Sequence, residues 1–364
     1  MEGLQHMKHV LILFGGVSSE HEVSLRSAAA VIDHIDRKLW DVSAVGITKD
    51  GNWFLYAGST ARIADGSWCT DKDNLLSAAL SPDRSVHGLY VFRPDGVQTL
   101  RVDVVFPVLH GKNGEDGTVQ GFLQLAGIPF VGCDALSSSM SMDKGVTNTI
   151  ADHFGVPQAK WLGVLREEYA ADPDAFARKA AQTLGFPLFV KPANAGSSVG
   201  VTKVSDESKL GEAMRLAFLH DRKVVLEEGI DGRELECAVL GNSDPLAPMV
   251  GEIVPCRDFY DYEAKYLTGD ESEIRIPAPV DAQTFARVQT LAKQVFLALG
   301  CSGLARVDFF CRRSDGAVLF NEINTIPGFT SISMYSKMLI AAGIPYAEIV
   351  TRLLELALEK WSEA

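Results

Sequence analysis

The stretch Asn321-Glu322-Ile323-Asn324-Thr325-Ile326-Pro327-Gly328-Phe329-Thr330 decides the fold more than any other part of the chain. Side chains two residues apart on a β-strand point to the same face of the sheet, so Glu322 and Asn324 are expected to project together. Upstream, Leu304-Ala305-Arg306-Val307-Asp308 opens a second apolar segment, and an Asp-Gly turn at 315–316 lies between the two. Asp-Gly flanked by apolar runs predicts a β-hairpin, so the two segments are expected to pair.

Pairing of these segments would bring Asp308 beside Glu322 and Asn324. Two carboxylates and one amide oxygen form a hard, oxygen-only site, which suits Mg²⁺ holding the phosphates of a nucleotide rather than zinc. Arg306, on the same face as Asp308, would add a fixed cation for a developing negative charge. The alternative is a solvated acidic hairpin. Against it, the apolar residues of the two segments indicate a buried sheet, namely Phe309, Phe310, Leu319, Phe320 and Ile323.

The bulk composition excludes several classes of protein. The 364 residues suggest two or three domains, and 47% hydrophobic with 22% charged residues is typical of a globular protein with sizeable cores. A formal net charge of −13 argues against nucleic acid as a partner, but not against ATP, whose phosphates respond to local cations. The 6 cysteines are scattered without a Cys-x-x-Cys pattern, which predicts reduced thiols in a cytoplasmic protein. No apolar run reaches the roughly 18–20 residues of a membrane span, and the polar start predicts no signal peptide, so no membrane association is expected.

The first part of the chain predicts an α/β layer. His9–Phe14 is a continuous apolar run that fits a parallel strand buried on both faces, and 40–47 and 102–109 are expected to be further strands. Gly15-Gly16 ends the first strand, and Ser19-x-x-Glu22 matches a capping box that opens a helix. A glycine turn between strand and helix presents backbone N–H groups to an anion. The Gly-x-Gly-x-x-Gly spacing of a dinucleotide site is not met here, so NAD is not expected.

The motif His110-Gly111-Lys112-Asn113-Gly114-Glu115-Asp116-Gly117-Thr118 follows the strand that ends at Leu109. Ligands of open α/β sheets gather at the carboxyl ends of strands, which favours a functional role for His110. A tight turn followed by a capped helix would explain the same residues without a ligand. Both interpretations of His110 remain open at this point.

A lysine at a strand end and a loop of small residues follow in the middle of the chain. Lys191 lies in the apolar run Leu188–Pro192, and Ala195-Gly196-Ser197-Ser198-Val199-Gly200 leads into the next segment, which is expected to be a strand to Val204. Such a loop can lie flat over phosphates and offer N–H groups and hydroxyls, although an ordinary hairpin turn has a similar composition. Lys144, at the start of a predicted helix, and Lys191 would both face the Mg²⁺ site, which favours phosphate binding.

Glu227-Glu228-Gly229-Ile230 follows a Val-Val-Leu strand, and another strand is expected from Arg233 to Leu240. A hinge of this kind can offer backbone groups to adenine, with Glu234 for the ribose hydroxyls. A charged surface turn explains the same residues equally well. Two later segments, 280–299 and 345–361, are expected to be helices.

The segment Arg257–Glu273 is long and charged, has no clean period, and contains four aromatic residues, Phe259, Tyr260, Tyr262 and Tyr266. Long segments without regular structure inside compact domains are often active-site lids. A solvent-exposed loop rarely carries four aromatic residues. The segment is therefore predicted to be a lid that is mobile without nucleotide.

Together these motifs resemble the D-alanine–D-alanine ligase family of the ATP-grasp superfamily, along the whole chain. Several motifs are generic to ATP-grasp enzymes, notably Lys191 and the metal face. Glu20, Glu263-Ala264-Lys265-Tyr266 and Gly328-Phe329-Thr330-Ser331 are the ones that indicate this family. The other matching motifs are Gly15-Gly16, His110-Gly-x-x-Gly-Glu-Asp-Gly-Thr, Met142-Asp-Lys144, Val190-Lys-Pro and Asn321-Glu-x-Asn-Thr-x-Pro-Gly.

The resemblance implies an α/β fold with a three-domain ATP-grasp architecture. An N-terminal doubly wound parallel-sheet domain is expected at 1–136, a central subdomain at 137–230, and a C-terminal domain at 231–364 that includes the lid loop 257–273. The implied reaction is the ATP-dependent joining of two D-alanines to D-alanyl-D-alanine for peptidoglycan precursor synthesis. The carboxylate of the first D-alanine attacks the γ-phosphate to give an acyl phosphate, and the amine of the second then displaces phosphate.

The resemblance also assigns roles to single residues. Glu20 would anchor the ammonium of the first D-alanine and link to the loop and the lid, and Arg306 with the Gly328 N–H would face the oxyanion. The implied catalytic residues are Glu20, Ser197, Tyr266, Arg306, Gly328 and Ser333. Those for the amino acids are Glu20, Val23, His110, Lys265, Arg306, Gly328, Ser333 and the Met334 backbone. Those for ATP are Lys144, Lys191, Ser197, Ser198, Glu227, Glu228, Ile230, Glu234, Phe310, Asn321 and Glu322, and those for the metal are Asp308, Glu322 and Asn324.

By the same resemblance the metal is Mg²⁺, with Mn²⁺ as a substitute and K⁺ as an additional ion, and the protein is a cytoplasmic homodimer. Two rival functions differ in class. One is an ATP-grasp ligase for a different amino acid, and the other is a nucleotide-binding regulatory module that has lost its chemistry. The joint presence of Arg306 and the metal face argues against the second rival, because a passive binder does not need a cation for an oxyanion. Tyr266 argues against relatives that use D-lactate.

Overall fold

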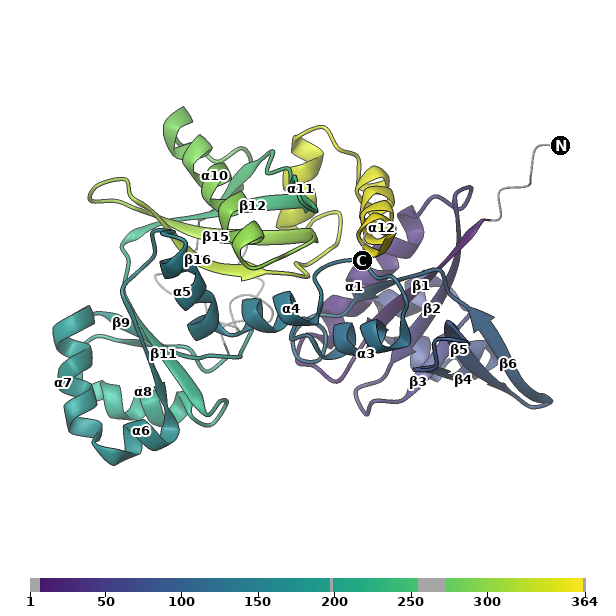
Figure 1. Ribbon diagram of the computed structural model, residues 1–364, viewed down its shortest axis with the longest axis horizontal. Helices are drawn as coiled ribbons and strands as arrows, with labels where there is room; N and C mark the ends of the chain where they lie inside the picture. Colours follow the sequence, from purple (N-terminus) through teal and green to yellow (C-terminus); the bar gives the residue numbers. More distant parts are fainter. Residues whose placement is uncertain (1–6, 197–198, 255–272, 363–364) are drawn as a thin grey trace.

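The computed structural model describes residues 7–196, 199–254 and 273–362. Within these ranges the chain forms three β-sheets with helices packed on them (Figure 1). Among the same residues, no helix is long and apolar enough to cross a membrane.

The first sheet has seven strands in the order β6-β5-β4-β3-β2-β1-β7. β1 (Lys8–Gly15) lies between β2 (Trp40–Ile47) and β7 (Val104–Val108) and is parallel to both, as predicted. The side chains of β1 from Val10 to Phe14 are fully buried. The helices α1 (His21–His34) and α3 (Thr118–Ala126) follow β1 and β7.

The rest of this sheet departs from the doubly wound prediction. Beyond β2, the sheet continues as an antiparallel meander of four strands, β3 (Trp53–Tyr56), β4 (Leu75–Leu80), β5 (Gly88–Arg93) and β6 (Gly96–Arg101). These strands are short and partly exposed, so they lack the continuous apolar run that marks β1. The short helix α2 (Thr60–Ala64) and two 3₁₀ turns, Ser67–Thr70 and Lys72–Asn74, lie between β3 and β4.

The predicted capping box at the start of α1 is wrong. The N-cap is Glu20, one residue later than predicted, and its side chain makes no capping hydrogen bond. Instead, Ser18 Oγ accepts a hydrogen bond from the Glu20 N–H at 3.1 Å, and Glu22 pairs with Lys49 at the surface. The carboxylate of Glu20 is therefore not used to cap the helix.

The second sheet is antiparallel, with four strands in the order β10-β9-β11-β8. Its strands are β8 (Trp161–Leu165), β9 (Leu188–Pro192), β10 (Thr202–Val204) and β11 (Lys223–Glu228). The predicted strand after the small-residue loop thus begins only at Thr202. The helices α6 (Arg166–Ala171), α7 (Pro173–Leu184) and α8 (Leu210–Ala217), with a 3₁₀ turn at Glu207–Lys209, lie beside this sheet (Figure 1).

The third sheet has five strands in the order β14-β13-β12-β15-β16. They are β12 (Gly232–Gly241), β13 (Val250–Val254), β14 (Glu273–Arg275), β15 (Gly303–Arg312) and β16 (Val318–Asn324). β15 and β16 form the predicted hairpin, with Asp308 opposite Glu322 and Arg306 opposite Asn324. Glu273, predicted as the end of the lid, is the first residue of β14, and 255–272 lie outside the described residues.

The two faces of the third sheet have different roles. One face packs against α10 (Ala282–Ala298) and buries Leu235, Val307, Phe309 and Ile323 in a hydrophobic core. Because successive side chains of a strand alternate between faces, the intervening residues lie on the opposite side. They include the charged residues Glu236, Arg306, Asp308 and Glu322.

Helices connect the sheets. α4 (Ala135–Met142) and α5 (Lys144–His153) lead from the first sheet to the second. α11 (Met334–Ala341) and α12 (Tyr346–Ser362) follow the third sheet, and α12 contacts α1, β7 and β15, so the end of the chain joins the third sheet to the first (Figure 1). The helices predicted at 280–299 and 345–361 are confirmed as α10 and α12.

Candidate active site

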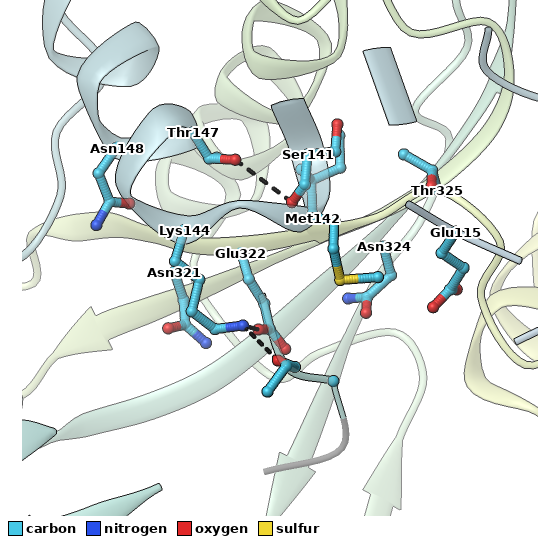
Figure 2. A pocket seen from close by; sticks show the side chains of 13 residues that line it. Glu115, Ser141, Met142, Lys144, Thr147, Asn148, Asn321, Glu322, Asn324 and Thr325 are labelled. Atoms are coloured by element: carbon cyan, nitrogen blue, oxygen red, sulfur yellow. Dashed lines mark hydrogen bonds and ion pairs between the residues drawn. The ribbon is translucent and has the colours of Figure 1, made fainter. Parts of the chain in front are cut away.

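A pocket lies where the segments after β7 and β9 meet the helices α4 and α5 and the strand β16 (Figure 2). Its lining includes Glu115, Lys144, Asn148, Gly196, Glu322 and Asn324. Residues that are up to about two hundred positions apart in the sequence therefore border one space. The lysine and the metal face predicted from the sequence are among them.

The metal face lies on β15 and β16. Asp308 is paired directly with Glu322 across the two strands, and Asn324 Nδ2 donates a hydrogen bond to Asp308 Oδ2 at 3.1 Å. Use of the amide nitrogen in this way leaves the amide oxygen of Asn324 for a metal ion. In the described part of the chain, no three His, Cys, Asp or Glu side chains converge on one point. Two carboxylates and one amide oxygen fit a Mg²⁺ ion that completes its shell with water and phosphate oxygens.

A β-bulge in β16 places two neighbouring residues on this pocket. Asp308 pairs with Glu322, but the next residue, Phe309, pairs with Phe320, so Asn321 has no partner in the register. Such an extra residue bends the strand and redirects a side chain. As a result Asn321 and Glu322 both line the pocket, although strict alternation would place them on opposite faces.

Arg306 is held by two carboxylates. Its Nε and Nη2 donate to the two oxygens of Asp308 at 2.8 and 2.7 Å, and Nε also lies 3.0 Å from Glu236 Oε2. Burial alone would lower the pKa of Arg306, but Asp308 and Glu236 outweigh it and hold that pKa well above its usual value. The guanidinium is therefore a permanent, oriented positive charge. Glu236 was not predicted, although its spacing of two from Glu234 was a signal for it.

The two lysines are also positioned by named partners. Lys144 Nζ donates to the carbonyl of Ala195 at 2.8 Å and lies 3.9 Å from Glu322 Oε2 (Figure 2). Lys144 thus joins the start of α5, the small-residue loop and the metal face. Lys191 Nζ lies 2.5 Å from Glu227 Oε2. Burial alone would lower the pKa of Lys191, but Glu227 and the more distant Glu322 and Glu234 outweigh it and raise that pKa.

The acidic side chains of the predicted adenine hinge, residues 227–230, make hydrogen bonds within and beside the second sheet. The Glu227 side chain neutralises Lys191 and accepts from Asn148 at 3.3 Å, so a contact with adenine at this residue would come from its backbone. Both the N–H and the carboxylate of Glu228 are bonded to the backbone of Lys160 at 2.9 Å. Of the other residues predicted for ATP, Phe310 lies opposite Glu234 on the charged face of the third sheet, and Ile230 is half-buried before β12.

Glu20 lies where the loop after β7 meets the small-residue loop. A Cβ added at Gly111 would lie 3.1 Å from Glu20 Oε1, and one added at Gly196 would lie 3.0 Å from the same atom. A Cβ at either glycine would crowd this carboxylate, so both loops lie close to it. Val23, in the first turn of α1, is half-buried. The predictions for Ser197, Ser198, Lys265 and Tyr266 concern residues outside those that the structure describes.

His110 fixes the loop that carries Gly328. One ring nitrogen contacts the carbonyl oxygen of Ile326 at 2.9 Å, and the other contacts Ser27 Oγ at 3.1 Å. Ser27 Oγ in turn accepts from the Phe329 N–H at 3.2 Å. Burial lowers the pKa of His110, although Glu20 opposes this. Both ring nitrogens are used within the protein, which favours the structural one of the two interpretations of His110.

Gly328 and Ser333 lie side by side at the start of α11. A Cβ added at Gly328 would lie 3.3 Å from Ser333 Oγ, and Ser333 is the N-cap of the helix. Ser333 Oγ contacts Thr330 Oγ1 at 2.7 Å. The first N–H groups of a helix have no partner inside it and favour an anion. The Met334 side chain is buried in the core, so only its backbone is available to a ligand there.

Comparison with known proteins matches two long segments of the chain to one family. The family model described as "D-ala D-ala ligase N-terminus" matches residues 9–133, and "D-ala D-ala ligase C-terminus" matches residues 150–355. The chain belongs to the D-alanine–D-alanine ligase family. It is therefore an enzyme with the ATP-grasp fold, a ligase that uses ATP and a divalent metal ion.

Full-length relatives agree with this assignment. The D-alanine–D-alanine ligase of Ruminiclostridium cellulolyticum is 47% identical, with 98% of this chain and 96% of the relative covered. The VanG D-Ala:D-Ser ligase from Enterococcus faecalis has a TM-score of 0.87 at 42% identity, over 96% of this chain and 99% of that one. The D-alanine-D-alanine ligase from Coxiella burnetii has a TM-score of 0.84 at 32% identity, over 98% and 96% of the two chains.

The pocket of this ligase contains one acid that was not predicted. Glu115 Oε2 accepts from the Gly111 N–H at 2.9 Å, and the side chain lines the pocket (Figure 2). Burial, with a further contribution from Glu20, raises the pKa of Glu115 well above its usual value. Glu115 belongs to the motif that begins at His110, and this position could have indicated a role in the site.

Proposed function

We propose that this ligase joins two D-alanines to D-alanyl-D-alanine for peptidoglycan precursor synthesis, with ADP and phosphate as the other products. The main support is the pairing of Asp308 with Glu322 beside Arg306 and Lys144, next to a loop whose Gly328 adjoins a helix N-terminus. Phosphoryl transfer requires mainly positioning and charge neutralisation. The same cleft adds a cation and N–H groups for an oxyanion and a carboxylate, which acyl transfer requires.

The first half-reaction forms the acyl phosphate. A carboxylate oxygen of the first D-alanine attacks the γ-phosphorus of ATP, a C–O–P linkage forms, and the bond to ADP breaks. Glu20 binds the ammonium group of this D-alanine, and Lys144 and Lys191 neutralise phosphate oxygens. A divalent ion held by Asp308, Glu322 and Asn324 supplies further neutralisation of the phosphates when it is bound.

The second half-reaction forms the peptide bond. The amine of the second D-alanine attacks the acyl carbon, and the carbonyl oxygen becomes an oxyanion near Arg306 and the Gly328 N–H. Collapse of this tetrahedral intermediate releases inorganic phosphate, which takes up the proton that the amine loses. Ser333 Oγ and the Met334 N–H, at the N-terminus of α11, bind the carboxylate of the second D-alanine.

The finer assignments belong to the same proposal. The metal is Mg²⁺, which Mn²⁺ can replace, and K⁺ is an additional ion. The enzyme works as a homodimer in the cytoplasm. Ser197, Ser198, Lys265 and Tyr266 complete the ATP and amino-acid sites in the roles that the sequence analysis gives them.

A second candidate is the joining of D-alanine to D-serine. The VanG D-Ala:D-Ser ligase matches this chain at 42% identity with a TM-score of 0.87, so overall similarity does not separate the two activities. They differ in the second amino acid alone. A direct comparison of second substrates is therefore needed.

The test is phosphate release with product identification by mass spectrometry, using ATP, Mg²⁺ and single or paired amino acids. With D-alanine alone we expect D-alanyl-D-alanine, with L-alanine no product, and with D-lactate as a second substrate little product at neutral pH. A mixture of D-alanine and D-serine at equal concentrations should still give mostly D-alanyl-D-alanine. Predominance of D-alanyl-D-serine would replace the first candidate by the second, and efficient formation of D-alanyl-D-lactate would contradict both.

A further inference from the structure

Glu236 is a buried acid beside the metal face that has no role in the reaction described above. It lies on β12, directly opposite Asp308, and is 6% exposed. Its Oε2 is 3.0 Å from Arg306 Nε, so it touches the cation that is to face the oxyanion. A buried carboxylate has a high cost of desolvation, which its partners must offset.

The oxygens of Asp308 take part in two kinds of interaction, hydrogen bonds within the protein and coordination of the metal ion. Both are hydrogen-bonded to Arg306, at 2.8 and 2.7 Å, and Oδ2 also accepts from Asn324 at 3.1 Å. The same carboxylate belongs to the set of ligands that fits a divalent ion. An ion bound to Asp308 would draw electron density away from these hydrogen bonds and repel the guanidinium, so the hold of Asp308 on Arg306 weakens at the stage when Arg306 is required.

We propose that Glu236 is a positioning residue of the ligase reaction, which keeps the Arg306 guanidinium directed at the developing oxyanion while Asp308 is engaged by the divalent ion. This inference rests on the proposed acyl-transfer function. Arg306 and Asp308 neutralise each other, so the negative charge of Glu236 also offsets part of the charge of the incoming ion. Glu236 acts through Arg306 and does not touch the substrate.

The same sheet offers a matched control on its other face. Glu252 on β13 is 4% exposed and lies 2.5 Å from Arg233 Nε and 3.5 Å from Arg275 Nη1. It lies opposite Leu235, so it is on the face away from Arg306 and the metal ligands. Glu252 and Glu236 are thus buried acids of one sheet, each paired with arginine, and only one of them contacts the site.

The experiment is a double-mutant cycle between Glu236→Gln and Arg306→Lys, with Glu252→Gln as the control. The assay is phosphate release with the amino-acid pair that the wild-type enzyme joins best. In the enzyme that keeps Arg306, Glu236→Gln should lower kcat by about 10–100-fold, with KM values changed less than about threefold. In the Arg306→Lys background the same change should lower kcat by less than about threefold. Glu252→Gln should leave kcat within about twofold.

Two further measurements test the role of Glu236 without measuring turnover. Calorimetry of ADP binding with and without Mg²⁺ should show that Glu236→Gln weakens the Mg²⁺-dependent part by about threefold to tenfold, and that Glu252→Gln does not. Circular dichroism and thermal melts check that each variant is folded. Glu236→Asp keeps the charge, so it should recover part of the lost kcat, and it replaces Glu236→Gln if that variant does not fold.

Unchanged kcat in Glu236→Gln, or the same fold-loss in both backgrounds, would overturn the proposal, because Glu236 would then act on stability alone. This outcome is distinct from a failure of the proposed function. If the wild-type enzyme makes another product in place of D-alanyl-D-alanine, the cycle can still be measured with that product's substrates.

Discussion

The two faces of the third sheet are built from the same strands, yet they carry different side chains beside α10 and beside the pocket. On one face Leu235, Val307, Phe309 and Ile323 pack under α10. On the other, the intervening residues include the acids Glu236, Asp308 and Glu322 and the arginine Arg306 beside them. Neighbouring residues of one strand therefore point alternately into the hydrophobic core and toward the residues of the active site. Substitutions on the first face should therefore change stability, and those on the second should change turnover.

The largest effect is expected on the charged face. Glu322→Ala or Asp308→Ala removes one of the two carboxylates of the metal face and leaves phosphate charge uncompensated. Turnover should fall by about 10²–10³-fold or more, while the circular dichroism spectrum stays that of the wild type. Near-full activity of Glu322→Ala at ordinary Mg²⁺ concentrations would show that the metal assignment is wrong.

The apolar face should respond in the opposite way. Phe309 is 1% exposed, and Phe309→Ala removes its ring from the core beneath α10. We expect the free energy of unfolding in urea to fall by about 3–5 kcal/mol, because a large cavity is left behind. At a temperature where the variant is still folded, kcat should remain within about tenfold of the wild type. A selective loss of kcat without a loss of stability would mean that the two faces are not separable in this way.

His110 lies between these two extremes, because it is buried and also supports the loop of Gly328. His110→Ala removes hydrogen bonds to Ile326 and Ser27, which should cost about 1–3 kcal/mol of stability. The loop should then lose its fixed position, and kcat should fall while the binding of ADP stays unchanged. Calorimetry with ADP separates this from a direct effect on nucleotide. A large loss of D-alanine binding, with kcat unchanged, would instead make His110 a direct ligand.

The smallest expected effect is a change with pH in the free energy of unfolding, caused by Glu115. Its pKa is raised from 4.5 in the folded enzyme, so its contribution to stability is fully present below that value and is lost as the pH rises through the folded pKa. Glu115→Gln stays neutral and avoids this loss. Without nucleotide, the free energy of unfolding of Glu115→Gln relative to wild type should therefore increase between about pH 4 and pH 8. A difference that does not depend on pH would show that the pKa of Glu115 is not raised.

The sequence predicted those features that depend on local patterns. The hairpin and the shared face of Asp308, Glu322 and Arg306 follow from an Asp-Gly turn and a period of two, and the parallel strand β1 follows from an uninterrupted apolar run. The meander β3–β6 was missed because its strands are short and partly exposed. The capping box was wrong because the helix begins one residue later, after Glu20, and the Glu22 side chain pairs with Lys49.

Other features depend on contacts between distant segments. The bulge at Asn321 changes the face of a residue, and its register cannot be read from one strand. The approach of Glu236 to Arg306 and the burial of Glu115 arise only when separate strands and loops come together. The domain boundaries at 136 and 230 stay predictions, as do the roles of the residues between 255 and 272.

The central claim is that the charged face drives the formation of an acyl phosphate from D-alanine. Its most direct test uses D-alanine with ¹⁸O in the carboxylate, ATP and Mg²⁺, with mass spectrometry of the phosphate released. Attack of the carboxylate on the γ-phosphorus, followed by displacement by an amine, transfers one carboxylate oxygen to phosphate. We predict one ¹⁸O atom in the phosphate for each dipeptide formed. Unlabelled phosphate, released together with dipeptide, would contradict the account.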